Sequence, residues 1–185
     1  MTLRIYGKRS LKTLPGLATR PTPSRVREAL FHIWRADLPH CRWLDICAGV
    51  GTMGAEALAR GAAFVAGIEK SGSACRVIEQ NWRAIAHPPQ QFQLERGDAR
   101  KVLSKFASLS SPFDCIYFDP PYASDLYLPV LDRVSTLGLL APDGQMAVES
   151  DLDRSLPETI ARLTVNNRRT YGKTVLTLYQ QKCSE

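Results

Sequence analysis

The chain has 185 residues, of which 44% are hydrophobic and 23% are charged, a composition that fits one globular domain with a sizeable core. It contains no run of about 18 apolar residues and begins without an apolar segment, so we expect neither a membrane-spanning helix nor a signal peptide. Its five cysteines are scattered, with no Cys-x-x-Cys pair. This pattern disfavours a disulfide framework or a metal site and favours reduced thiols in a cytoplasmic protein.

The positive charge is concentrated at the beginning of the chain. Residues 1–35 hold eight Lys and Arg and a single acid, Glu28, for a net charge of +7, whereas the other 150 residues hold 16 basic and 17 acidic groups, for a net charge of −1. Clustered cations attract a polyanion by releasing its counterions, so residues 1–21, here called the basic arm, are candidates for contact with phosphates. A flexible, solvated terminus explains the same charge, and composition does not separate the two.

After the basic arm, helix-like and strand-like segments alternate. A hydroxyl cap and a proline in Thr22-Pro23-Ser24 predict the start of a first helix, in which apolar residues recur at helical spacing from Val26. Strands are predicted over residues 43–47, 64–69, 92–96, 113–118 and 146–149, and helices over residues 53–60, 71–86, 99–106 and 125–137. The last segment, LTVNNRRTYGKTVLTLYQ, predicts a hairpin that turns near Gly172.

This alternation predicts an α/β fold. We expect a doubly wound, mostly parallel, Rossmann-like sheet with helices on both faces, a C-terminal antiparallel hairpin and a short basic N-terminal extension. The basic arm, residues 1–21, belongs to the same domain, whose main part spans residues 22–185. In such sheets ligands bind beyond the carboxyl ends of the strands, so residues that follow each strand are the candidates for chemistry.

The first predicted strand is followed by a glycine loop, Gly49-Val50-Gly51-Thr52-Met53-Gly54, which matches the G-x-G-x-x-G pattern and leads into a helix. Such glycines let a ligand approach the backbone, and the pattern usually indicates the pyrophosphate of a dinucleotide. Asp45 argues against NAD, because it lies within a strand that is normally apolar in dinucleotide-binding proteins and because its charge repels a pyrophosphate. A cationic ligand is attracted by the same carboxylate.

Two further acids follow the second and third strands. Glu69 ends the second strand, where an acid can accept hydrogen bonds from both ribose hydroxyls of an adenosine; an acid exposed in a turn is the alternative. Asp98 follows the third strand. It can accept from an adenine amino group or cap the helix that begins at Ala99, and these two roles are compatible.

Four motifs occur in the order seen in S-adenosylmethionine-dependent methyltransferases that modify amino groups of nucleobases: Asp45-x-x-x-Gly49-x-Gly51, Glu69, Gly97-Asp98 and Asp119-Pro120-Pro121-Tyr122. The segment RPTPSRVREALFHIW, residues 20–34, resembles more specifically the RsmD family of small-subunit (16S) ribosomal RNA guanine-N2 methyltransferases. The resemblance runs from Arg4 to the final hairpin. It differs at the start, where the family generally has Arg-Ile-x-Gly-Gly and this chain has RIYGK over residues 4–8.

The resemblance implies that the protein transfers a methyl group from S-adenosyl-L-methionine to the exocyclic amine of a guanine in 16S ribosomal RNA, within the small ribosomal subunit. The cysteine pattern predicts a cytoplasmic protein, and a monomer is the default expectation. The cofactor site that we expect consists of Asp45, Ala48, Gly49, Gly51, Glu69, Lys70, Asp98, Ala99 and Asp119. The predicted catalytic residues are Asp119, Pro120, Pro121 and Tyr122. The predicted RNA contacts are Arg4, Lys8, Arg9, Arg20, Arg25 and Arg27.

The chemistry of such a transfer explains the residue types at positions 119–122. An exocyclic nucleobase amine is a weak nucleophile, because its lone pair is delocalised into the ring. The Asp119 carboxylate and the Pro120 carbonyl can accept its N–H groups and orient it, while Tyr122 offers a stacking surface for an extruded base. Aspartate is a weak base, so orientation is expected rather than prior proton removal. A capped turn with a packed tyrosine is the structural alternative.

Guanidinium groups bind phosphate oxygens in pairs, which makes Arg20, Arg25 and Arg27 candidates for the RNA backbone. For Arg27, an ion pair with Glu28 or another acid explains the sequence equally well. Three other functions stay open: a DNA adenine-N6 or cytosine-N4 methyltransferase, an NAD-dependent oxidoreductase, and an RNA-binding protein without catalysis. The short chain leaves no room for a separate DNA-reading domain, whereas an RNA loop is recognised largely by shape.

Overall fold

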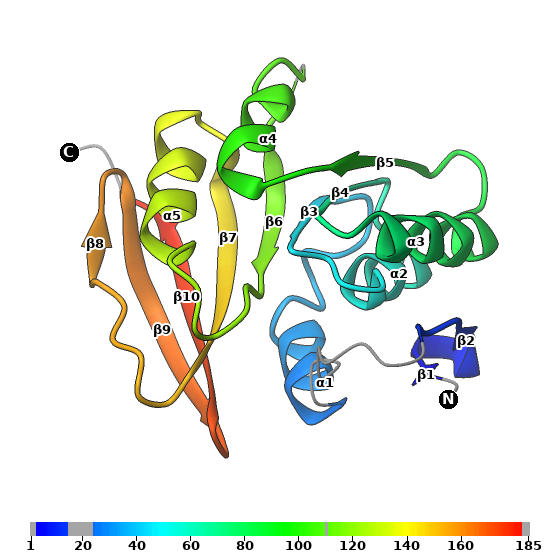
Figure 1. Cartoon of the computed structure of the whole chain (residues 1–185), viewed down its shortest axis with the longest axis horizontal. Helices are drawn as coiled ribbons and strands as arrows, with labels where there is room; N and C mark the ends of the chain where they lie inside the picture. Colours follow the sequence, from blue (N-terminus) through cyan, green and yellow to red (C-terminus); the bar gives the residue numbers. More distant parts are fainter. Residues whose placement is uncertain (1–2, 15–23, 110, 183–185) are drawn as a thin grey trace.

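The computed structural model describes residues 3–14, 24–109 and 111–182. Within these residues, eight strands form one sheet in the order β5-β4-β3-β6-β7-β10-β9-β8 (Figure 1). The strands are β3 (Arg42–Ile46), β4 (Phe64–Glu69), β5 (Gln91–Arg96), β6 (Phe113–Phe118), β7 (Leu140–Asp151), β8 (Thr159–Ile160), β9 (Leu163–Tyr171) and β10 (Thr174–Gln181). Strands β3 to β7 are parallel, and β10, β9 and β8 continue the sheet in antiparallel fashion. The predicted fold class is confirmed.

Helices cover both faces of this sheet. They are α1 (Ser24–Ile33), α2 (Thr52–Ala59), α3 (Gly72–Ile85), α4 (Ala99–Phe106) and α5 (Tyr127–Thr136). The first three pack on one face and the last two on the other (Figure 1). Side chains alternate along β3, so that Trp43 packs with the first group and Leu44 with the second. None of the helices in the described part of the chain is long and apolar enough to cross a membrane.

The parallel register brings the ends of four strands to one edge of the sheet, here called the carboxyl edge. Ile46 at the end of β3 pairs with Ile68 of β4 and with Phe118 of β6. Glu69 pairs with Arg96, which ends β5. The residues that follow β3, β4, β5 and β6 therefore lie side by side, at the edge where the sequence predicted ligand binding.

The C-terminal strands form the predicted hairpin. β9 and β10 pair up to Tyr171 and Thr174, which leaves a two-residue turn between them, and β10 also pairs along β7. β7 is longer than the predicted strand 146–149, since it begins at Leu140. Gly144 makes this possible, because a Cβ there would lie 2.9 Å from the Asp114 carbonyl oxygen of the neighbouring strand.

The described part of the basic arm is folded against the domain. β1 (Leu3–Arg4) and β2 (Ser10–Leu11) form a small antiparallel pair joined by the short 3-10 helix η1 (Tyr6–Lys8). Ile5 and Leu11 are buried in the core, and the Asn81 side chain of α3 binds the Lys12 backbone at 2.9 and 3.1 Å. The alternative of a solvated terminus is therefore wrong for residues 3–12. Arg20 and the helix cap predicted at residues 22–23 lie outside the described residues.

Candidate active site at the carboxyl edge

Acidic side chains from four strands converge at the carboxyl edge. The evidence is the environment of Cys47, which directly follows β3. Burial raises the pKa of the Cys47 thiol, and the negative charges of Glu69, Asp119, Asp45 and Asp98 raise it further. Because charge–charge interactions in proteins weaken with distance and are screened by solvent and salt, these four predicted site residues lie around one region of the edge. The region is rich in carboxyl groups.

Two of these carboxylates hold the glycine loop, residues 49–54. Glu69 accepts hydrogen bonds from the Gly49 N–H at 2.8 Å and from the Ser71 N–H at 2.7 Å. Asp45, which is 1% exposed, accepts from the Gly54 N–H at 3.0 Å. Gly49 has a left-handed φ of +60°, and a Cβ there would meet no other described residue within 4 Å. The loop therefore leaves open space beside Gly49, where a ligand can approach the backbone.

The other two glycines of the pattern have a structural reason of their own. Trp82 of α3 lies against the loop, and its Nε1 donates to the Gly51 carbonyl oxygen at 2.7 Å. A Cβ at Gly51 would lie 2.7 Å from that nitrogen, and a Cβ at Gly54 would lie 2.3 Å from the indole ring. Both positions must be glycine to admit Trp82, whatever ligand the loop binds.

The buried position of Asp45 changes its protonation. The pKa of Asp45 is raised to about 7, chiefly because burial disfavours the carboxylate. The negative charge of Glu69 adds to the rise, and the hydrogen bond from Gly54 opposes it. A positive charge next to Asp45 favours the carboxylate and lowers the pKa. The site is therefore sensitive to the charge of its ligand.

Asp98 caps α4, as one of its two predicted roles requires. Its carboxylate accepts from the Arg100 N–H at 2.9 Å and pairs with the Arg100 guanidinium at 2.6 Å, and these contacts lower the pKa of Asp98 to about 2. Arg100 also reaches Asp125 at 3.3 Å, in the loop that follows β6. The predicted contact of Asp98 with an adenine is compatible with the cap and stays a prediction.

The remaining predicted cofactor residues lie along the same edge. Ala48 donates from its N–H to the Ile68 carbonyl oxygen at 3.0 Å, which places it between β3 and β4. Lys70 is exposed, and its charge contributes to the lowered pKa of Asp98. Ala99 is buried at the first position of α4. Their contact with a ligand stays a prediction.

Residues 119–122, here called the DPPY corner, leave β6 at the carboxyl edge. The Asp119 N–H donates to the Ile46 carbonyl oxygen at 3.3 Å, so the acid begins beside the end of β3. The Tyr122 hydroxyl donates to the Glu149 carboxylate at 2.9 Å, and burial raises the pKa of Tyr122. Tyr122 is thus anchored through its hydroxyl, while its side chain is still partly exposed. The structure brings the corner and the glycine loop to one edge.

Comparison with known proteins assigns a family to this fold and site. Residues 3–180 match the family described as conserved hypothetical protein 95. The chain is 31% identical over 174 residues to YlbH of Bacillus subtilis, a protein named provisionally as an rRNA methyltransferase, with 94% of both chains covered. It is 30% identical over 172 residues to ribosomal RNA small subunit methyltransferase D of Escherichia coli strain K12, with 91% of this chain and 81% of that protein covered. The chain belongs to the RsmD family of methyltransferases.

Solved structures share the RsmD-family fold seen here. The protein yhhF of Escherichia coli, described provisionally as a methyltransferase, aligns with a TM-score of 0.82 at 27% identity over 100% of both chains. The protein HI0767 of Haemophilus influenzae, described provisionally as a methylase, aligns with a TM-score of 0.80 at 25% identity over 98% of this chain and 99% of that chain. The whole chain, including its N-terminal segment, is thus covered by structural relatives.

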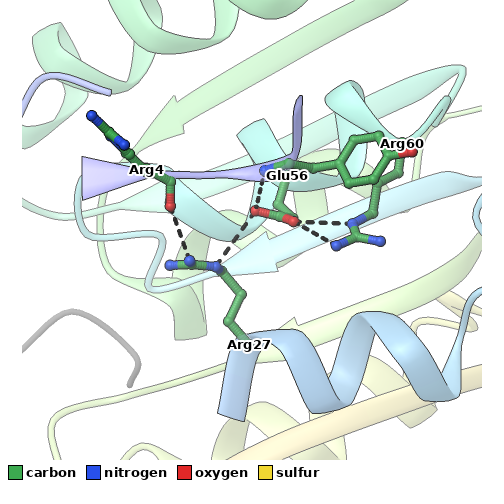
Figure 2. A network of polar contacts seen from close by, with 5 residues as sticks. Arg4, Arg27, Glu56 and Arg60 are labelled. Carbon is green, nitrogen blue, oxygen red and sulfur yellow. Dashed lines mark hydrogen bonds and ion pairs between the residues drawn. The ribbon is translucent and has the colours of Figure 1, made fainter. Parts of the chain in front are cut away.

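One predicted RNA contact of this RsmD-family chain is wrong. Arg27 of α1 is only 4% exposed, and its guanidinium lies between the Arg4 carbonyl oxygen at 3.0 Å and the Glu56 carboxylate at 3.4 Å (Figure 2). Glu56 also pairs with Arg60 at 2.8 Å (Figure 2) and accepts the Tyr6 N–H at 3.2 Å. The alternative of an ion pair is confirmed, with Glu56 of α2 as the partner rather than Glu28. Arg27 of α1 therefore contacts both the basic arm, at Arg4, and α2, at Glu56, and links the three segments.

The other predicted RNA contacts differ in exposure. Arg4, Lys8 and Arg25 are exposed. Arg9 is partly buried, with its guanidinium 3.5 Å from the Ile85 carbonyl oxygen, and Arg20 lies outside the described residues. Contact of these side chains with RNA stays a prediction.

A separate cavity of about 320 Å³ lies at the amino ends of β3 and β6, at the opposite edge of the sheet from the DPPY corner. Its lining includes Cys41, Asp114 and Cys115. In the described part of the chain, no group of three or more His, Cys, Asp or Glu is placed to hold a metal ion. We assign this cavity no part in the candidate active site.

Proposed function

We propose that this RsmD-family protein transfers a methyl group from S-adenosyl-L-methionine to the exocyclic amine of a guanine in 16S ribosomal RNA. The observation that supports this most is the convergence of Asp45, Glu69, Asp98 and Asp119 at the carboxyl edge, where the DPPY corner also begins. The carboxyl-rich region proposed for the cofactor then lies next to the Asp119 carboxylate and the Pro120 carbonyl, which can accept hydrogen bonds from an amine.

The charge of this region fits the proposed cofactor. When bound, S-adenosylmethionine supplies a methyl group on a positively charged sulfur. The carboxylates attract that charge, whereas they repel the pyrophosphate of NAD at the same place, so the oxidoreductase alternative has no support here. Glu69 binds Gly49 and Ser71 with one oxygen each, and each oxygen has a second acceptor position for a ribose hydroxyl.

The chain's own residues orient the second substrate. The Asp119 carboxylate and the Pro120 carbonyl accept the N–H groups of the exocyclic amine, which directs the nitrogen lone pair toward the cofactor region. Asp119 is partly exposed, and its backbone borders the end of β3, so it lies where the corner meets the strand that leads into the glycine loop. After transfer the nitrogen becomes acidic, and Asp119, already hydrogen-bonded to it, can receive its proton.

The substrate class rests on the relatives and on the basic arm. The Escherichia coli relative is named for the ribosomal RNA of the small subunit. The arm of this chain carries exposed cations at Arg4 and Lys8, as a polyanionic substrate requires. We propose that the RNA is methylated within an assembling small subunit, in the cytoplasm, by a monomer.

The contribution of the arm is tested by substituting its exposed cations. We expect Arg4→Ala and Lys8→Ala to weaken RNA binding and to reduce the slope of log affinity against log salt by about 0.7–0.9 for each lost phosphate contact. Affinity for S-adenosylmethionine should stay the same. Lys101→Ala, which removes an exposed cation from α4 on the other face, is the matched control. An equal loss of cofactor affinity in the arm variants would contradict this division of roles.

The proposed function itself is tested by cofactor titration and by transfer of labelled methyl groups. We expect calorimetric binding of S-adenosylmethionine and no binding of NADH, followed by label in small-subunit RNA that lacks the modification. Tight NADH binding without S-adenosylmethionine binding would overturn the methyltransferase assignment. Label in duplex DNA and none in RNA would replace the substrate by DNA.

A further inference from the structure

Glu149 is a buried acid next to the DPPY corner. It lies on β7 one residue beyond Val148, which pairs with Phe118, the last residue of β6. Glu149 therefore lies beside Asp119, the first residue of the corner, in the strand order of the sheet. Only 2% of Glu149 is exposed, and a buried carboxylate is costly unless hydrogen bonds compensate for the lost water.

Two tyrosine hydroxyls supply those hydrogen bonds. Tyr122 of the corner donates to Glu149 Oε1 at 2.9 Å, and Tyr117 of β6 donates to Glu149 Oε2. The Tyr122 hydroxyl also lies 3.3 Å from Thr174 Oγ1 at the start of β10. Burial raises the pKa of Glu149, and the hydrogen bonds from Tyr117 and Tyr122 oppose that rise because they favour the carboxylate. The carboxylate accepts at both oxygens at once, so in this form Glu149 can hold the two rings together.

The backbone of Tyr122 is held from a second direction. Arg154 donates from Nη2 to the Tyr122 carbonyl oxygen at 2.6 Å, and its guanidinium lies 4.3 Å from the centre of the Tyr127 ring. The Tyr127 hydroxyl in turn donates to the Glu149 carbonyl oxygen at 3.3 Å. Tyr122 is thus fixed at its hydroxyl and at its carbonyl, and both sets of contacts meet at Glu149.

We propose that Glu149 is a positioning residue for methyl transfer, which acts through Tyr122 by fixing the angle of the ring against which the target base stacks. This inference rests on the proposed function, and it names a residue that touches neither the cofactor nor the base. Stacking on an immobile ring loses less conformational entropy than stacking on a mobile one. A fixed ring also places the amine at a reproducible distance from Asp119 and Pro120.

Hydrogen exchange tests the anchoring without any substrate. In Glu149→Gln, we expect the backbone amides of residues 122–126 to exchange about tenfold faster than in the wild type, because the corner opens locally. The Ser124 N–H, which donates to the Pro121 carbonyl oxygen at 2.8 Å, is a direct reporter of that opening. The control is Tyr179→Phe, which removes another buried tyrosine bond, to Pro157 at 2.7 Å. Unchanged exchange in Glu149→Gln would overturn the inference.

A double-mutant cycle tests the route through Tyr122. We expect Glu149→Gln and Tyr122→Phe each to lower kcat for RNA methylation about tenfold, as loss of a hydrogen bond to a charged group does. The double variant should also lose about tenfold rather than about a hundredfold, because both changes weaken the same Tyr122–Glu149 hydrogen bond. Affinity for S-adenosylmethionine should stay within about twofold in every variant, and Tyr179→Phe should keep the wild-type kcat.

The outcomes separate the inference from the proposed function. A hundredfold loss in the double variant, or a loss of cofactor affinity that parallels the loss in kcat, would mean a general structural role and overturn the positioning role. Methylation of RNA with unaltered kcat in Glu149→Gln would also overturn it while the proposed function stands. Faster exchange in Glu149→Gln, combined with no RNA methylation by the wild type, would retain the anchor and refute the proposed substrate.

Discussion

The protonation of Asp45 predicts how cofactor affinity depends on pH. In the ligand-free protein the pKa of Asp45 is raised to about 7, so below that pH the carboxyl is mostly neutral. A positively charged ligand favours the ionised form and lowers this pKa, by about 1–3 units for an opposite charge at close range. Binding at low pH must therefore displace a proton from Asp45, and affinity must fall as the pH falls.

The size of the effect follows from the linkage of proton release to binding. Between pH 7.5 and pH 5.5 the affinity should fall by about 6-fold if binding lowers the pKa by 1 unit, and by about 20-fold if binding lowers it by 2–3 units. The contribution of Asp45 to the stability of the ligand-free protein changes in the opposite sense. An acid whose pKa is raised on folding binds more protons in the folded state, so its contribution to the free energy of unfolding falls as the pH rises from about 4 to about 7. Acid unfolding therefore does not explain the predicted loss of affinity.

The assay is calorimetric titration of S-adenosylmethionine in buffers of different ionisation enthalpy, which also counts the protons released. Asp45→Asn should bind more weakly at pH 7.5 and lose the pH dependence, because the amide can still accept from Gly54 but cannot ionise. Asp98→Asn is the control, since the pKa of Asp98 is lowered to about 2 and its charge is constant over this range. An equal affinity at both pH values, or an unchanged pH dependence in Asp45→Asn, would refute the reasoning.

Three further predictions concern the loop, the corner and the arm. Gly51→Ala should abolish cofactor binding and lower the melting temperature more than Gly49→Ala, because only the former meets Trp82; equal effects in a thermal melt would contradict this. Asp119→Asn should lower kcat by about 10²–10³-fold and weaken cofactor binding much less, because Asp119 is only one of several predicted cofactor residues; stopped-flow and calorimetry can separate the two effects, and a kcat within a factor of about three of wild type would argue against its orienting role. Glu56→Gln should lower the free energy of unfolding by about 3–5 kcal/mol in urea titrations, since it leaves a buried arginine without its counter-charge, and a change below about 1 kcal/mol would mean that the network contributes little.

The sequence predicted the central part of the fold well because hydrophobic periodicity is strongest where both faces of a strand are buried. The predicted strands 64–69 and 113–118 and the helix 99–106 coincide with β4, β6 and α4. The positions of the four acids at the carboxyl edge were also predicted, since each lies near the end of a recognisable strand or directly after one. The predicted strand 146–149 is shorter than β7, because Pro142, Asp143 and Gly144 are residue types typical of a turn. Only the pairing of β7 with β6 shows that the strand begins before them.

The errors and omissions concern polar residues whose partners are far away in the sequence. The prediction left Arg27 open between RNA contact and an ion pair, because nothing in one sequence shows that Glu56, 29 residues later, is buried behind it. The prediction placed Glu149 at the end of the strand 146–149 and gave it no role. A lone acid directly after the apolar residues Met146, Ala147 and Val148 nevertheless indicates a carboxyl group that needs buried partners. Its partner Tyr122 is 27 residues away, and only the folded sheet brings the two together.

The central claim is that the DPPY corner presents a guanine amine of 16S ribosomal RNA to a methyl donor held at the glycine loop. The most direct test is mass mapping of small-subunit RNA from cells that lack this protein. We expect one N2-methylguanine to be absent, to return when the wild-type chain is supplied, and to stay absent with Asp119→Asn. A complete set of guanine methylations in the cells that lack the protein would contradict the account.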